Sequence, residues 1–278
     1  ADTVNNTIIT LNPNYIAKGE KYEARIGGTA VLDMSVTNGF HVYPNVDFSY
    51  KIVEDIIIPF VGASGGLTKN SYRNITLDNP FVYSDLQMKN TSTTYLLFGG
   101  LKGNLSSHIS YVAKAAYSSI NNLMMYVNDD DLLQNRFRVI YDNAEELNVH
   151  GEVFYQQREK LRIGLSGDYY NYKMKDKVNN PQAWYKPQLK VAATANYNLK
   201  DKIIIKVNLF YLDKQYARTT VDDNSKLGYT VVAKELKPVF DANLGGEYRY
   251  NKKLGFFLNF NNVANQRYLR YVNYPTQR

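Results

Sequence analysis

Apolar and polar residues alternate along most of this chain with a period of two. The clearest run is 185–199, where one parity is apolar throughout and the other carries Lys, Gln, Thr and Asn with a single Ala. The same split recurs in the runs 22–34, 46–52, 109–118, 147–156, 161–170, 203–212, 240–250 and 254–262. Successive side chains of a strand point to opposite faces. The pattern therefore predicts an all-β chain in which no long segment needs a helix.

The breaks between these runs come in two sizes. Short polar breaks, typical of hairpin turns, lie at 19–20, 54–55, 105–107, 158–160, 200–202 and 251–253. Longer breaks, interrupted by one tight Asn38-Gly39 turn, lie at 67–91, 119–145, 174–184 and 214–235, and the break 119–145 is open to being partly strand. We therefore expect one domain over residues 1–278, an antiparallel up-and-down β-barrel with about twelve strands in this chain, short turns at one rim and long loops at the other.

Alternation alone is compatible with a soluble β fold and with a transmembrane barrel. The apolar face points inward in a soluble sandwich or lipocalin-like barrel and outward in a transmembrane barrel. Runs such as 185–199 exceed the roughly five to six residues of a globular strand and suffice for the roughly nine to eleven of a tilted spanning strand. Tyr185 and Tyr197 lie near both ends of one apolar face, as in aromatic girdles. Together with the unequal rims, these features favour an outer-membrane barrel surrounded by lipid.

Composition excludes several other classes. Cysteine is absent, so the chain has neither disulfides nor a cysteine-ligated metal. The longest apolar run, 56–63, is about eight residues long, whereas a spanning helix needs roughly 18. The net charge is +7, but Lys and Arg share the polar parity with Asp and Glu. Such mixed charge suits a water-filled lumen better than a track for phosphates, so nucleic acid is not an expected partner.

A more specific pattern lies near the C-terminus. Two alternating runs end in Asn261-Asn262-Val263, and two aromatic segments follow, Gln266-Arg267-Tyr268 and Asn273-Tyr274-Pro275. Over roughly 183–275 the chain resembles the C-terminal barrel of TonB-dependent receptors, in the style of Bacteroidetes outer membranes. The resemblance implies a Gram-negative outer-membrane receptor that binds a ligand at external loops and imports it through the barrel. It also implies TonB or a surface lipoprotein as partners.

The chain departs from a complete family member. The resemblance implies a larger barrel filled by an N-terminal plug and preceded by a TonB-contacting box, and neither is recognisable in this sequence. A return strand after the run 254–262 is also missing. We therefore expect this chain to be an incomplete part of a larger barrel. A structural or accessory subunit of an outer-membrane complex, or a passive porin, is the alternative function.

Ligand contacts are expected on the external loops, because loops on a rigid scaffold vary most freely. The candidate contacts are the loop aromatics Tyr72, Phe81, Tyr83, Tyr216 and Tyr229. The three histidines, His41, His108 and His150, are not at metal-ligand spacing. We therefore expect no metal, and His150, on one face with Asn148 and Glu152, is interpreted as a polar lumen residue.

Carboxylate and hydroxyl side chains elsewhere in the sequence do not match a known metal-binding or catalytic motif. Asp129-Asp130-Asp131 could hold calcium, but the spacing and glycine of an EF-hand are missing, so a solvated loop is the preferred interpretation. No Gly-x-Ser-x-Gly occurs, and Ser166 and Asp168 have no histidine near them in the sequence. The sequence therefore predicts no catalytic residue, no cofactor and no enzyme activity.

Overall fold

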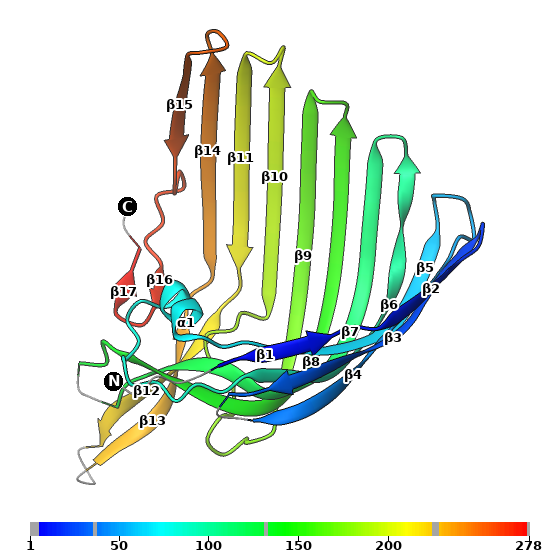
Figure 1. Ribbon diagram of the computed structural model, residues 1–278. Helices are drawn as coiled ribbons and strands as arrows, with labels where there is room; N and C mark the ends of the chain where they lie inside the picture. Colours follow the sequence, from blue (N-terminus) through cyan, green and yellow to red (C-terminus); the bar gives the residue numbers. More distant parts are fainter. Residues whose placement is uncertain (1–5, 36–37, 131–132, 224–227, 277–278) are drawn as a thin grey trace.

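A computed structural model describes residues 6–35, 38–130, 133–223 and 228–276 (Figure 1). One antiparallel sheet dominates these residues, with its strands side by side in chain order and β2 paired to β3 at one edge. The sheet is curved and, over the described residues, does not close on itself. Its strands are β1 (Ile8–Leu11), β2 (Asn14–Lys18), β3 (Tyr22–Asp33), β4 (Gly39–Tyr50), β5 (Ile58–Thr68), β6 (Thr91–Ser106), β7 (Ile109–Asn128), β8 (Phe137–Gln157), β9 (Leu161–Met174), β10 (Leu189–Leu199), β11 (Ile203–Leu212), β14 (Val239–Arg249) and β15 (Gly255–Phe260).

This arrangement confirms the predicted all-β up-and-down topology of about twelve strands. All six predicted short turns join neighbouring strands, and we call the edge that they form the short-turn rim. Lys200 and Asp201 both have positive φ, 53° and 56°, and the Lys202 N–H donates to the Leu199 carbonyl at 3.1 Å, so the chain reverses here in a tight turn. The long connections lie at the opposite edge, the long-loop rim (Figure 1).

The two faces of the sheet differ in polarity as the alternation predicts. Across β7, β8, β9 and β10, the residues Lys114, His150, Asp168 and Lys190 are paired in one row, so one face carries a line of titratable groups. On the other face, large apolar side chains such as Leu165 remain 53% exposed. A soluble sheet would bury those side chains. The outward apolar face is the one that a bilayer would cover.

The predicted strand 185–199 is wrong at its beginning. Strand β10 starts at Leu189, and Tyr185 lies in the preceding loop with a φ of 55°. Its ring packs against Phe137 and Tyr271, with ring centroids 5.9 and 5.3 Å apart. Tyr185 therefore does not form an aromatic girdle with Tyr197. The alternation of apolar and polar residues extends over 185–188 although these residues precede the strand.

The predicted long break 119–145 is largely strand, the alternative that the sequence left open, because β7 continues to Asn128 and β8 begins at Phe137. The register between these strands shifts between Ile120 and Leu123, and Asn122 has a φ of 55°. This irregularity has the character of a β-bulge, which adds a residue to one strand and moves the following side chains to the other face. The period-two pattern is broken there, although the strand is not.

Three further elements lie at the long-loop rim. The loop after β5 contains a short helix, α1 (Tyr72–Asp78), and residues 214–235 form mainly a hairpin of β12 (Gln215–Asp223) and β13 (Gly228–Leu236). Near the C-terminus, β16 (Leu269–Tyr271) pairs with β17 (Tyr274–Pro275) beside α1 (Figure 1). No described helix is both long and apolar enough to cross a membrane.

The buried apolar core sits at the long-loop rim rather than within the spanning part of the sheet. Its largest fully buried side chains include Trp184, Phe137, Ile75 and Met125. They fall into neighbouring clusters that pack α1, the ends of β7 and β8, the loop before β10 and the C-terminal hairpin together. The rim elements are therefore fixed in place as a packed layer.

Candidate functional site

Helix α1 and the segment that follows it are attached to β8. The helix begins after Ser71, whose hydroxyl accepts a hydrogen bond from the Asn74 backbone N–H at 3.3 Å, as an N-cap does. After the helix, the chain pairs with Phe137, which donates to the Phe81 carbonyl at 3.1 Å and accepts from the Tyr83 N–H at 3.0 Å. The backbone therefore fixes both aromatic residues relative to β8.

Three of the predicted ligand contacts line one pocket of about 380 Å³. Tyr72, Phe81 and Tyr83 form its wall together with Arg136 and Tyr274, among other residues. The ring of Phe81 is stacked on that of Tyr274, with centroids 3.6 Å apart. The structure thus brings together aromatic residues from α1, the following loop and the C-terminal hairpin. We call this group the loop pocket.

Positive charge lies next to the aromatic wall of the loop pocket. The guanidinium groups of Arg136 and Arg138 lie 5.2 and 5.3 Å from the centre of the Tyr83 ring, within reach of cation–π attraction. Arg138 is neutralised by Asp129, with Nε 3.0 Å from Oδ1. The exposed Arg136 has no ion pair among the described residues, so its charge is free to meet an anion.

Asp129 also anchors Tyr83, which donates its phenolic hydrogen to the carboxylate. Burial disfavours the charged form of Asp129, but hydrogen bonds from Tyr83 and Arg138 outweigh burial and hold the pKa of this carboxyl below its usual value. The same hydrogen bond raises the pKa of the Tyr83 phenol above its ordinary value. Asp129 is only 6% exposed, so the prediction that it lies in a solvated loop is wrong. Asp131 lies outside the described residues.

These pKa shifts predict how the contact depends on pH. Asp129 stabilises the contact above its ordinary pKa of 3.8, and this contribution is lost as the pH falls through the lowered native value. The contribution of Tyr83 is present below its ordinary pKa of 10.0 and is lost as the pH rises through the raised native value. The contact between the two side chains should therefore persist across the neutral range.

Asp129→Asn is expected to return the pKa of Tyr83 toward its ordinary value, because the carboxylate that disfavours ionisation is gone. Spectrophotometric titration, taken as the difference from a matched Tyr83→Phe chain, measures this shift. Asp130→Asn is the control, since Asp130 is exposed and does not accept the phenolic hydrogen bond. An unchanged tyrosine titration in Asp129→Asn would contradict the assigned hydrogen bond.

The other two predicted contacts lie apart from the loop pocket. Tyr216 is in β12, packs against the core cluster that contains Trp184, and accepts a hydrogen bond at its carbonyl from the Tyr185 N–H at 2.9 Å. Tyr229 lies in β13, where its backbone pairs with Asp222; its side chain is outside the described residues. Tyr216 therefore contributes to packing of the core rather than to the loop pocket.

Sequence reasoning missed Arg136 and Tyr274. Arg136 falls in the break 119–145, where no motif singles it out, and Tyr274 falls in the segment Asn273-Tyr274-Pro275, which indicated the resemblance but no ligand contact. The exposed positive charge near aromatic residues was the only available signal. The pairing of distant segments, which places both residues beside Phe81, is visible only in the fold.

The register also creates a contact for His150. Its Nδ1 lies 2.9 Å from Asp168 Oδ1 and its Nε2 lies 3.7 Å from Glu152 Oε2. Asp168, which has no histidine near it in the sequence, thus has one across the strand pair. Within the described ranges, no three potential ligand side chains are arranged to hold a metal ion. The group is a polar, charged part of the sheet wall.

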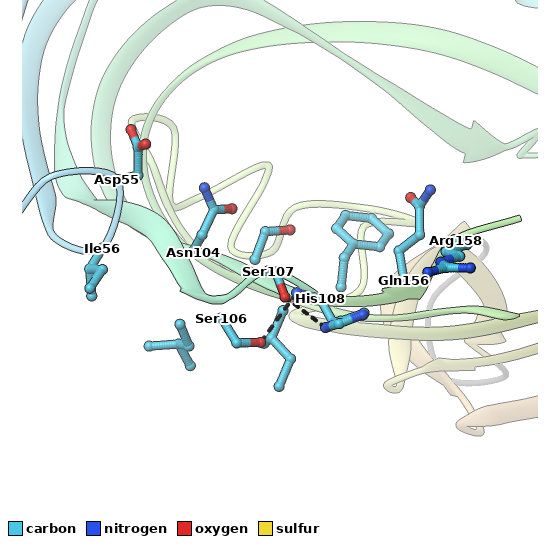
Figure 2. A pocket seen from close by; sticks show the side chains of 12 residues that line it. Asp55, Ile56, Asn104, Ser106, Ser107, His108, Gln156 and Arg158 are labelled. Carbon is cyan, nitrogen blue, oxygen red and sulfur yellow. Dashed lines mark hydrogen bonds between the residues drawn. The ribbon is translucent and has the colours of Figure 1, made fainter.

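A larger pocket, of about 770 Å³, lies at the short-turn rim (Figure 2). It is lined by Ile56, His108 and Arg158, among others. His108 Nδ1 lies 2.9 Å from the Ser107 hydroxyl, and the His108 N–H donates to the Ser106 hydroxyl at 3.2 Å. None of the predicted ligand contacts lines this pocket.

Several solved outer-membrane structures share this arrangement of strands. The ferripyoverdine receptor of Pseudomonas aeruginosa, bound to ferripyoverdine, matches 99% of this chain at 13% identity with a TM-score of 0.64. The outer-membrane transporter YddB of Escherichia coli matches 95% at 11% identity with a TM-score of 0.65. The ferric-catecholate import receptor Fiu of E. coli K12 also matches 95%, at 12% identity and a TM-score of 0.60.

The fold is that of the TonB-dependent outer-membrane receptor barrel. This chain spans 37%, 42% and 41% of the three structures just described. The named neighbours of this barrel are receptors and transporters, which agrees with the expectation that the chain is not an enzyme. No protein-family model and no curated protein sequence matches the chain.

Proposed function

We propose that this chain is part of an outer-membrane receptor that binds a ligand at its external loops and imports it through the barrel. The observation that carries the proposal is the convergence of Tyr72, Phe81 and Tyr83 on one pocket beside Arg136, which has no ion pair within the described ranges. The shared fold with known receptors supports it. In this proposal the long-loop rim faces the outside of a Gram-negative cell, and residues 1–278 belong to one barrel domain.

The chemistry of the loop pocket favours an anionic ligand with aromatic groups. Exposed aromatic faces stack on planar groups, and a guanidinium binds carboxylates and other oxyanions through paired hydrogen bonds. The pocket volume of about 380 Å³ lies within the range of small-molecule sites. Two of the structural neighbours are named for ferripyoverdine and ferric catecholates. Ferric chelates of these two classes are therefore suitable probes.

The proposal includes the partners implied by the resemblance. Energised import through the barrel requires TonB, and a surface lipoprotein would act with a Bacteroidetes-type receptor. The apolar outer face would contact outer-membrane lipid, as its exposed large side chains suggest. These partners are tested in cells that carry the whole receptor.

Arg136→Gln is expected to weaken binding of an anionic chelate about tenfold, because a charge-assisted contact is lost. The measurement is a binding titration of detergent-solubilised chain with ferripyoverdine and with a ferric catecholate. Arg73→Gln is the matched control, since Arg73 is exposed on α1 and does not line the loop pocket. The same affinity in the Arg136 and Arg73 variants would show that this pocket is not the contact site.

A passive porin or an accessory barrel subunit is distinguished by its energy requirement. Cells that express the full receptor should lose chelate uptake when TonB is deleted, because import against a gradient needs coupled energy. Uptake that persists without TonB would favour a passive pore. Absence of uptake in both backgrounds, with the protein in the outer membrane, would favour an accessory subunit.

A further inference from the structure

A second pocket, of about 310 Å³, lies on the polar side of the sheet behind the C-terminal hairpin. Its walls come from the loop before β10, the ends of β7, β10 and β11, the start of β14 and the segment around β16. Its basic side chains are Lys186, Lys190 and Arg270. It shares none of its lining residues with the loop pocket, and we call it the lysine pocket.

Two of these cations lack an acidic partner. Lys186 is half-buried, and its backbone N–H donates to the Ala183 carbonyl at 3.3 Å. Within the described part of the chain, however, its ammonium forms no ion pair or hydrogen bond. The Lys190 ammonium lies 5.1 Å from the centre of the Tyr170 ring and is likewise without an ion pair among the described residues.

Two carboxylates, those of Asp78 and Glu146, attract the Lys186 ammonium, but neither forms an ion pair with it among the described residues. Asp78 also lines the lysine pocket, and there its carboxylate lies 3.5 Å from the Arg270 guanidinium, which neutralises it. Burial, and then repulsion from Lys190, lower the pKa of Lys186, and the attraction of these carboxylates does not offset them. An anion placed between the two lysines would relieve both the desolvation and the repulsion.

The remaining walls of the lysine pocket are mostly aromatic or apolar. The half-buried Tyr185 and Tyr268 give the pocket aromatic surface, and Met124 and Leu212 add aliphatic surface. Trp184 and Tyr271, which also line the pocket, are only 2% and 5% exposed. Such walls would bind a planar apolar group and would gain nothing from a small inorganic ion. Two cations that have no ion pair in the described part of the chain, together with aromatic walls, select an organic anion.

We propose that the lysine pocket binds a small aromatic carboxylate, with the carboxylate between Lys186 and Lys190 and the ring against the aromatic walls. This site goes beyond the proposed receptor function and does not depend on the loop pocket. It lies on the polar side of the barrel, where a ligand would pass after leaving the external surface. The chain would thus hold two separate sites along one face.

The single tryptophan of the chain provides the test. Trp184 lines the lysine pocket, so a bound heavy-atom quencher lowers its fluorescence. The chain is titrated in detergent micelles with para-iodobenzoate, and the neutral para-iodobenzamide measures quenching by partition into the micelle. Saturable quenching is expected with the carboxylate only, and unlabelled benzoate should compete with it.

Lys186→Gln and Lys190→Gln are each expected to weaken para-iodobenzoate binding about tenfold, because each removes one charge-assisted contact. Lys186→Arg keeps the charge and should retain most of the affinity. Lys206→Gln is the matched control, since Lys206 is on β11 but does not line the pocket. Arg136→Gln, which tests the loop pocket, should also leave benzoate binding unchanged, so the two proposals can fail separately.

Equal saturable quenching by the amide, no competition by benzoate, or wild-type affinity in Lys186→Gln would overturn the proposal. Folding of each variant is checked by its heat-modifiable migration in gels. If Lys186→Gln does not fold, Lys190→Gln is judged by the same criterion of a tenfold loss. Wild-type affinity in that variant would equally overturn the site.

Discussion

Gly103→Ala is expected to disrupt folding of the sheet more than alanine at any other glycine of the described residues. A Cβ at this position would lie 2.0 Å from the Ile56 carbonyl oxygen and 2.6 Å from its carbon. The turn between β4 and β5 folds over the glycine and is held there, because the Asn104 N–H donates to the Asp55 carbonyl at 2.6 Å. The Ile56 carbonyl also accepts from the Tyr111 hydroxyl at 3.0 Å.

The contacted atoms are backbone, so they can move only if the turn leaves its place. Overpacking of this kind costs about 3 kcal/mol or more, which is a large part of the stability of a typical domain. The measurement is the urea midpoint for unfolding of the chain from detergent or lipid vesicles, followed by gel migration and tryptophan fluorescence.

Gly246→Ala is the matched control for Gly103→Ala. Gly246 lies in β14 of the same sheet, and an added Cβ would find nothing within 4 Å. Neither glycine has a positive φ, so backbone strain does not separate the two substitutions. Equal urea midpoints for both variants would show that the β4–β5 turn does not pack on Gly103.

Asn90→Ala is expected to release the loop that carries α1. The Asn90 side chain is 1% exposed and donates to Asp33 Oδ1 and to the Ser35 hydroxyl, both at 3.1 Å. Its oxygen accepts from the Asn70 N–H and from the Asn6 amide, both at 3.2 Å. One side chain therefore connects both ends of the α1 loop to the end of β3 and to the N-terminal segment.

Without the Asn90 amide, the buried or half-buried groups of Asp33, Ser35 and Asn70 lose a hydrogen-bond partner. This loss should lower the free energy of unfolding by about 3 kcal/mol. Hydrogen exchange of amides in residues 69–90 should accelerate, because their opening no longer requires breaking the Asn90 network. The affinity for a chelate should fall as well, since Tyr72 and Phe81 are positioned by this loop.

Asn74→Ala is the control. Asn74 is exposed on α1, and the N-cap hydrogen bond to Ser71 comes from its backbone N–H, which alanine retains. Its exchange pattern should stay close to that of the wild type outside the helix. Wild-type exchange in the loop of Asn90→Ala would mean that the buried amide network does not fix α1.

The barrel topology could be predicted from the sequence because strands in a bilayer experience a uniform environment. Every outward side chain of such a strand meets lipid, so the period-two pattern is regular wherever the strand spans. Runs such as 161–170 and 240–250 matched β9 and β14 for this reason. The tight turns could also be predicted from the sequence, because a hairpin turn depends on a few adjacent residues.

The long-loop rim could not be predicted in the same way, because its environment is set by distant segments. Tyr185 shares its parity with strand residues but packs against Phe137 and Tyr271, and the irregularity near Asn122 hides the continuation of β7. Helix α1 is too short to show a clear 3.6 period. At this rim, packing between segments decides the structure.

The sequence alone determined the all-β class, the outward apolar face and the loops on which Tyr72, Phe81 and Tyr83 lie. These follow from local periodicity and from the cost of unpaired backbone groups in lipid. Only the tertiary structure decided that these three residues share a pocket with Arg136 and that Lys186 and Lys190 line a second pocket. Such groupings depend on contacts between residues far apart in the chain, and no local pattern of residues records them.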